Sequence, residues 1–264
     1  MRSKFPRRKT CYEEIQNKKL KEFYVVIHVV TFEMMLGKKP VLELSKVYII
    51  YGIDILGART IIGIYKEDKE NTRYWLNEIE KIKMRGLKKI AYVSIEKNNR
   101  LEQAFKIVYN PEIRESINEK IERIAKYVSR KAAIIDEQDI TRAYVSETLE
   151  EYEKLMAEIE DKYKENAIGI LLLKKLREQT DQDIKEPRQI RHIINSHATK
   201  RKLKLRMQKL SREYEEIENI EDLVEKSKEY FSMFERTRIY SKKQWSDILN
   251  VVYELKKEEI QEYI

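Results

Sequence analysis

The run LKKIAYVSIE (87–96) most constrains the fold, because it is almost continuously apolar. Such a run is typical of a β-strand whose two faces are both covered by other elements. Two earlier stretches, 46–55 and 59–67, are rich in β-branched and aromatic residues and flank the turn LGA, which predicts a hairpin. Residues 23–35 have the same texture. Together these segments predict one sheet with helices packed against it.

Helical spacing follows the hairpin and then dominates the chain. In 71–86, Trp75, Ile79 and Ile82 fall on one helical face, an Asn or Thr supplies the N-cap and Gly86 ends the helix. Two more helices are expected at 99–109 and 112–130, and only helices from about 138 onward. With 6 Gly and 4 Pro, the chain has too few turn residues for a many-stranded β fold. We therefore expect an α/β layer followed by a helical half.

Three amphipathic helices are expected near the C-terminus, at 199–219, 221–235 and 241–263. The first has a basic face opposite an apolar face, which is formed by Leu203, Met207, Leu210, Tyr214 and Ile217.

Positive charge is concentrated in two segments. The net charge is +8, from 54 Lys and Arg against 46 Asp and Glu. Residues 1–21 contain eight basic and two acidic residues, and residues 188–212 contain nine basic and no acidic residues. The rest holds 37 basic residues (54 less eight and nine) and 44 acidic ones (46 less two), a net charge of −7. A basic arm and a basic strip on an acidic body indicate a polyanionic partner, nucleic acid first.

The candidate DNA contacts are the cations of these two segments. They would meet the backbone phosphates of double-stranded DNA, and they are Arg188, Arg191, Lys200, Arg201, Lys202, Lys204, Arg206, Lys209 and Arg212, with Arg7, Arg8 and Lys9 of the arm. The competing interpretation is a solvated helix face and a solvated tail. No apolar stretch reaches the roughly 20 residues that a membrane span needs. We expect a cytoplasmic, nucleoid-associated protein, either monomeric or homodimeric.

The segment VYIIYGIDILGARTIIGIYKEDKENTRYWLNEIEKIKMRGLKKIAYVSIE (47–96) resembles the mutator-type transposases of prokaryotic insertion sequences. In that family a Gly-Ile-Asp hairpin precedes an aromatic-Trp-Leu helix, an Arg-Gly stop and a strand. The resemblance continues more weakly through ERIAKYVS, RQIRHIINS and the final helices around Trp245. It implies a ribonuclease-H-like α/β (α+β) fold, with a mixed sheet, flanking helices, a large all-helical insertion and C-terminal helices.

The resemblance also implies two Asp and a distant Glu that hold two divalent metals, and this sequence departs from it at all three positions. The first Asp falls at or beside Val29, the second at Ser94 and the Glu near Arg201. A Cys and a His of the family align with Ser116 and Glu119. Two-metal strand cleavage needs several converging carboxylates, so we expect no catalytic residue, no metal and no cofactor.

A rearranged metal site would have to use Glu33, Asp54 and Glu96, which lie near strand ends, but they are more simply explained as surface or turn carboxylates. His28, His192 and His197 lack partners at ligand spacing, so we expect them to be packing or surface residues. Cys11 is the single cysteine, which excludes an internal disulfide.

Four segments are expected: a basic N-terminal arm (1–22), the first part of the core (23–136), a helical insertion (137–186) and a helical part that completes the core (187–264). The resemblance implies a longer N-terminal region with a helix-turn-helix, whereas about 22 residues precede the first expected strand here, so we expect no base-specific readout through such a module. Three functions stay open: a catalytically inactive transposase relative that binds DNA with low sequence specificity, a scaffold whose amphipathic helices bind a protein, and a nuclease or transposase with a rearranged metal site.

Overall fold

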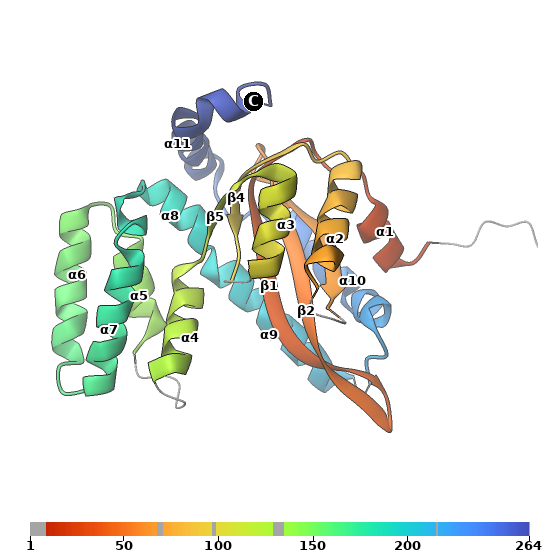
Figure 1. Ribbon diagram of the computed structural model, residues 1–264, viewed down its shortest axis with the longest axis horizontal. Helices are drawn as coiled ribbons and strands as arrows, with labels where there is room; N and C mark the ends of the chain where they lie inside the picture. Colours follow the sequence, from red (N-terminus) through yellow and green to blue (C-terminus); the bar gives the residue numbers. More distant parts are fainter. Residues whose placement is uncertain (1–8, 68–70, 97–98, 129–134, 215, 264) are drawn as a thin grey trace, which may run out of the picture.

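A mixed five-stranded sheet forms the centre of the protein (Figure 1). The computed structural model describes residues 9–67, 71–96, 99–128, 135–214 and 216–263. The strand order is β3-β2-β1-β4-β5; β1 pairs antiparallel with β2 and parallel with β4, β2 pairs antiparallel with β3, and β4 pairs parallel with β5. The strands are β1 (Phe23–Lys38), β2 (Val41–Ile53), β3 (Arg59–Lys66), β4 (Lys89–Ser94) and β5 (Glu112–Arg114). This sheet with its many helices confirms the expected α+β class.

One face of the sheet is covered by α2 (Thr72–Met84) and α3 (Asn99–Tyr109) (Figure 1). Trp75, Ile79 and Ile82 of α2 are fully buried, as their spacing predicts. The Asn71 side chain caps the helix by accepting from the N–H of Arg73. Gly86 follows the helix with φ +110°, a conformation that favours glycine.

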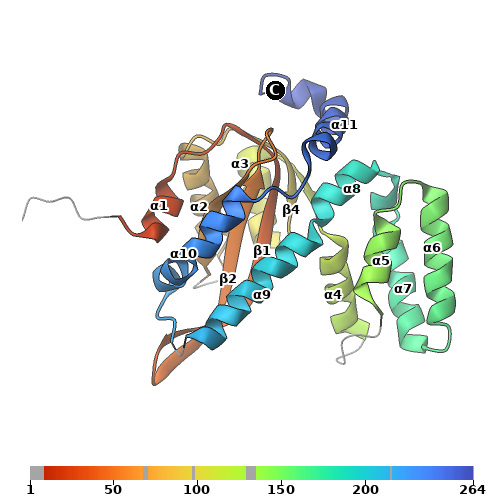
Figure 2. The ribbon, with the colours of Figure 1, turned by 180° about the vertical axis from the view of Figure 1, so that it is seen from behind.

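The opposite face is covered by α9 (His197–Glu213) and α10 (Ile220–Arg236), which lie across β1 and β2 in Figure 2. Two further helices, α8 (Arg188–Asn195) and α11 (Lys242–Ile260), flank them. Leu203, Met207 and Leu210 are fully buried, but α9 is shorter than the expected 199–219. Tyr214 is 40% exposed, because the chain becomes extended there. Leaving the helix lets the Ile217 carbonyl accept from the N–H of Gly37 in the β1–β2 hairpin.

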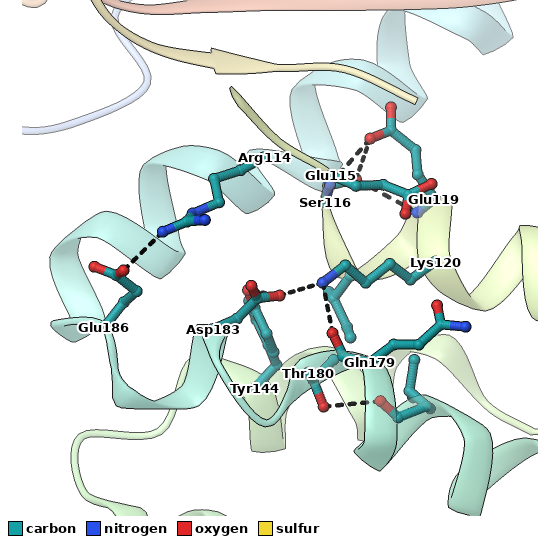
Figure 3. Close-up of polar contacts among 12 residues, drawn as sticks. Arg114, Glu115, Ser116, Glu119, Lys120, Tyr144, Gln179, Thr180, Asp183 and Glu186 are labelled. Carbon is teal, nitrogen blue, oxygen red and sulfur yellow. Dashed lines mark hydrogen bonds and ion pairs between the residues drawn. The ribbon is translucent and has the colours of Figure 1, made fainter. Parts of the chain in front are cut away.

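A helical lobe lies beside the sheet and has its own apolar core (Figure 1). It contains α4 (Ile117–Val128), α5 (Glu137–Tyr144), α6 (Leu149–Lys162), α7 (Ala167–Thr180) and the 3-10 turn η1 (Asp183–Lys185). Because α4 packs inside this lobe, the lobe begins some twenty residues before the expected boundary at 137. Lys120 ties α4 to the end of the lobe by donating to the Gln179 carbonyl at 3.0 Å and by pairing with Asp183 (Figure 3).

Two short elements were not expected. Helix α1 (Cys11–Asn17) begins at a capping box between Thr10 and Glu13 and buries Ile15, so the described part of the 1–22 segment is folded onto the core rather than a free arm. Strand β5 occupies the start of the expected 112–130 helix. No helix among the described residues is long and apolar enough to cross a membrane.

Candidate functional site

His28 and Ser94 stand side by side where the parallel strands β1 and β4 pair. Both side chains are fully buried. The first family position was expected at or beside Val29, and Val29 itself packs with Trp75 and Ile79 on the other face of the sheet. Successive side chains of a strand point to opposite faces. The residue of β1 that faces Ser94 is therefore His28, which lies beside Val29.

Lys200 of α9 extends its ammonium group to the same place. Its Nζ donates to Ser94 Oγ at 3.0 Å and to Glu119 Oε1 at 2.9 Å. The Lys200 and Glu119 side chains are 5% and 6% exposed, so the ion pair is buried. The family Glu was expected near Arg201. Arg201 itself is exposed, because consecutive helical residues differ by about 100° in direction. Lys200 is thus the α9 residue at this site.

The ion pair is completed by hydrogen bonds on both sides. Glu119 Oε2 accepts from the Ser116 backbone N–H at 3.1 Å and from its hydroxyl at 2.8 Å (Figure 3). The Ser94 hydroxyl donates to the Ile194 carbonyl at 2.8 Å. Burial alone would raise the pKa of Glu119, but the charge and hydrogen bond of Lys200 and the hydrogen bonds from Ser116 bring that pKa below its ordinary value. Glu119 is therefore an ionised carboxylate at neutral pH.

His28 lies at the edge of this cluster as a packing residue. Its ring stacks on Tyr51 at 4.8 Å, and Ser196 Oγ lies 3.2 Å from the Tyr51 hydroxyl and 3.4 Å from each imidazole nitrogen. Burial, followed by the charge of Lys200, lowers the pKa of His28 well below its ordinary value. The imidazole is neutral at pH 7.

A serine beside a lysine can act as a nucleophile in hydrolases, but the geometry here gives Ser94 another role. The hydroxyl is fully buried, its proton is donated to Ile194, and the neighbouring Lys200 is paired with Glu119. Ser94 connects strand and helix within the core.

Asp54 and Glu33, two of the carboxylates considered for a rearranged metal site, lie far from each other. Asp54 Oδ1 accepts from the N–H groups of Leu56 and Ala58 at 2.9 and 3.0 Å, which makes it a turn residue between β2 and β3. Ile53, next to Asp54, pairs with Val26, whereas Glu33 lies seven residues farther along β1, or roughly 23 Å. In the described parts of the chain, no three His, Cys, Asp or Glu residues are grouped so as to hold a metal ion.

The cations of α9 divide into paired and unpaired groups. Arg206 and Lys209 each approach Glu213 at 3.3 Å, and Lys204 lies 3.8 Å from Glu122. Three further cations are exposed and have no carboxylate within ion-pair distance among the described residues: Arg201, Lys202 and Arg212.

The other cations expected at DNA differ in accessibility. Arg191 is 4% exposed and donates to the carbonyls of Tyr144, Ser146 and Glu186, so it joins α8 to the helical lobe and is removed from the candidate surface. Lys200 is removed for the same reason, since it is buried. Arg188 is exposed and pairs with Glu147 at 3.1 Å, and Lys9 is exposed. Arg7 and Arg8 lie outside the described residues.

The two remaining histidines are His192 of α8 and His197 at the start of α9. The His192 ring lies 5.5 Å from that of Tyr240. His192 is exposed, and partial desolvation by its neighbours, followed by the charge of Arg188, lowers its pKa. The His197 side chain lies outside the described residues.

A groove of about 480 Å³ runs between α5 and α9. Arg142, Arg201 and Lys202 line it, and Ala198 and Leu205 supply part of its apolar surface. Arg142 was not among the expected cations, because it is 59 residues from Arg201 and approaches it only through the fold. Similarly, Glu119 and Lys200 are 81 positions apart.

Comparison with known families gives a match over most of the chain. The family model described as Transposase, Mutator family matches residues 8–221. Comparison with curated proteins gave no match. The family match includes the hairpin, the sheet, the helical lobe and the basic helix α9, and it covers well over half of the 264 residues, so the chain belongs to the Mutator family of transposases.

Proposed function

We propose that this transposase-family protein binds double-stranded DNA through backbone contacts and does not cleave it. The observation that carries the proposal is the buried ion pair between Lys200 and Glu119, at the strand ends where the family resemblance predicts metal-binding carboxylates. An architectural or regulatory role on DNA fits these properties.

The residues at this place do not fit two divalent metals. Magnesium and similar hard cations need several anionic oxygens. The cavity beside Ser116 and Lys200 is lined by three carboxylates, Glu119, Glu122 and Glu137, and by three cations, Lys200, Arg201 and Lys204. The oxygens of Glu119 already accept from Lys200 and Ser116. His28 and Ser94 are neutral, and the Lys200 ammonium would repel a divalent cation. We therefore derive no metal-dependent step for this chain.

The exposed cations of α9 that have no ion pair among the described residues support the DNA-binding half of the proposal. Arg201 and Arg212 are eleven residues apart, which is roughly 16 Å along a helix and nearly the same direction. Double-stranded DNA carries one charge per roughly 1.7 Å of its axis, so several phosphates lie within that length. Contacts of this type recognise the backbone and carry little sequence information.

Two measurements test the proposal. The first is incubation of the protein with plasmid and linear DNA in magnesium or manganese, for which we expect no cleavage and no joining. Metal-dependent nicking that disappears in Asp54→Ala or Glu96→Ala would refute the proposal that the protein does not cleave DNA. It would support the alternative of a nuclease with a rearranged metal site.

The second measurement is a DNA titration at several salt concentrations. Replacing Arg201, Lys202 and Arg212 with Ala should weaken binding equally across sequences and make the slope of log K against log salt shallower by about two to three, at about 0.9 for each phosphate contact. The matched control replaces Lys154, Lys174 and Lys175, which are exposed on α6 and α7 and change the net charge equally. An unchanged slope in the α9 variant would show that the strip is only a solvated helix face.

The structure gives less support than the sequence did to the hypothesis of a scaffold whose amphipathic helices bind a protein. The apolar faces expected to bind a partner are used inside the chain: Leu203 and Met207 of α9, Phe231 and Phe234 of α10 and Trp245 of α11 are all buried in one core cluster.

A further inference from the structure

The groove between α5 and α9 combines an apolar lining with unpaired cations. Its apolar atoms come from Ala198, Val145 and Leu205, and Leu205 is 52% exposed although it is a leucine. Around them stand Arg142, Arg201 and Lys202, all exposed. Among the described residues, none of these three cations has a carboxylate within ion-pair distance.

The charge of the groove selects an anionic occupant. Three cations and one carboxylate, Glu137, line it, which leaves a net charge of +2. Other cations of α9 are paired, as in Lys204 with Glu122 and Arg206 with Glu213. Arg212 is exposed and has no carboxylate within ion-pair distance among the described residues, but it lies outside the groove. Exposed apolar surface beside cations that have no ion pair among the described residues therefore distinguishes this groove from the rest of α9.

The apolar lining excludes an intact duplex as the occupant of the groove itself. A duplex presents phosphates outside and keeps its base faces stacked inside, so it offers nothing to Leu205 or Ala198. An unpaired nucleotide offers both a phosphate and a free base face. Base faces stack on apolar groups and on arginine guanidinium planes, and this binding is tolerant of sequence. The volume of about 480 Å³ lies within the range of small-ligand sites.

We propose that the groove between α5 and α9 binds unpaired nucleotides of a DNA strand, with Arg142, Arg201 and Lys202 at the phosphates and Ala198, Val145 and Leu205 against a base. This inference rests on the proposed DNA-binding function and adds a preference to it. The protein would hold DNA ends, gaps or junctions that expose single-stranded segments more tightly than blunt duplex.

The test compares a blunt fluorescent duplex with the same duplex carrying a short single-stranded thymidine tail, by fluorescence anisotropy. One stacked base is enough for about a tenfold gain in affinity, so we expect the tailed duplex to bind at least that much more tightly. Ala198→Trp fills the groove without changing the charge, and Leu205→Asn makes its lining polar. Each variant should lose the preference for the tail and keep the affinity for the blunt duplex.

The matched control is Gln208→Trp, which adds the same side chain to an exposed position of α9 outside the groove and should leave both affinities unchanged. Equal affinity of the wild type for both DNAs would overturn the inference and leave the proposed function standing. A tail preference that survives Ala198→Trp and Leu205→Asn would also overturn it, because the site would lie elsewhere.

Two other outcomes separate the remaining alternatives. Failure to bind either DNA would refute the proposed function, and the inference with it. An acidic amphipathic peptide that binds the wild type but not Ala198→Trp, without any tail preference, would assign the groove to a protein partner and overturn the nucleotide proposal.

Discussion

Replacing Lys200 with Met should destabilise the protein strongly although the substitution is nearly equal in length. The change leaves Glu119 ionised, 6% exposed and without its counter-charge. Breaking a buried ion pair in this way costs about 3–5 kcal/mol. In a protein of this size each kcal/mol lowers Tm by about 2–4 °C, so a drop of about 6–20 °C is expected. Thermal and urea unfolding followed by circular dichroism measure both quantities.

The pH dependence of this loss identifies its cause. In the wild type the pKa of Glu119 is lowered, so its contribution to stability is fully present above the ordinary pKa of 4.5 and is lost as pH falls through the lower folded value. In Lys200→Met, burial without the ammonium should raise the folded pKa instead, so the penalty is present above that value and disappears as pH falls through it. The two stability curves should therefore converge in acid.

Two comparisons complete the experiment. Lys204→Met removes a partner of Glu122 at 3.8 Å, with side chains 26% and 43% exposed, and should cost less than about 1 kcal/mol. The double variant Lys200→Met, Glu119→Gln should recover most of the lost stability, because no charge remains buried. If Lys200→Met unfolds within about 1 kcal/mol of the wild type at pH 7, or if its deficit is independent of pH, the ion pair is not the buried, mutually dependent unit described here.

Two further predictions concern the burial of Trp75 and the role of Lys200 in DNA binding. Trp75→Ala should destabilise the protein by about 3–5 kcal/mol in urea unfolding, because it removes a fully buried aromatic side chain; a full melting temperature would contradict the packing of α2. The double variant Lys200→Met, Glu119→Gln should bind DNA with unchanged affinity and salt slope, because both side chains are buried and the net charge is the same; a slope shallower by about 0.9 would show that Lys200 contacts a phosphate.

Elements with complete local signals could be predicted from the sequence. Helix α2 has an apolar stripe, an Asn71 cap and Gly86 after its end, and each is readable within a few residues. Strand β4 is a short apolar run whose side chains are buried on both faces of the sheet. The errors follow from weaker signals: β5 has three residues, and the capping box of Thr10 and Glu13 that begins α1 lies inside a segment whose charge suggested a free arm.

The candidate site was harder to predict than the fold for two reasons. Its residues are far apart in the sequence, and a shift of one position along a strand or a helix changes the direction of a side chain. One residue along a strand reverses the side chain, which separates Val29 from His28, and one residue along a helix turns it by about 100°, which separates Arg201 from Lys200. No alternation or spacing in the sequence joins Glu119 to Lys200 across 81 positions. The fold supplies that contact.

The helical phase also divides the seven basic residues of 195–212 into three uses. Lys200 points inward and forms the buried pair with Glu119, while Lys204, Arg206 and Lys209 are engaged with surface carboxylates. Only Arg201, Lys202 and Arg212 are exposed without a carboxylate within reach among the described residues. The charge count therefore overstates what the strip can offer to DNA. At about 0.9 for each phosphate contact, these three cations account for a salt slope of about three, whereas seven would account for about six.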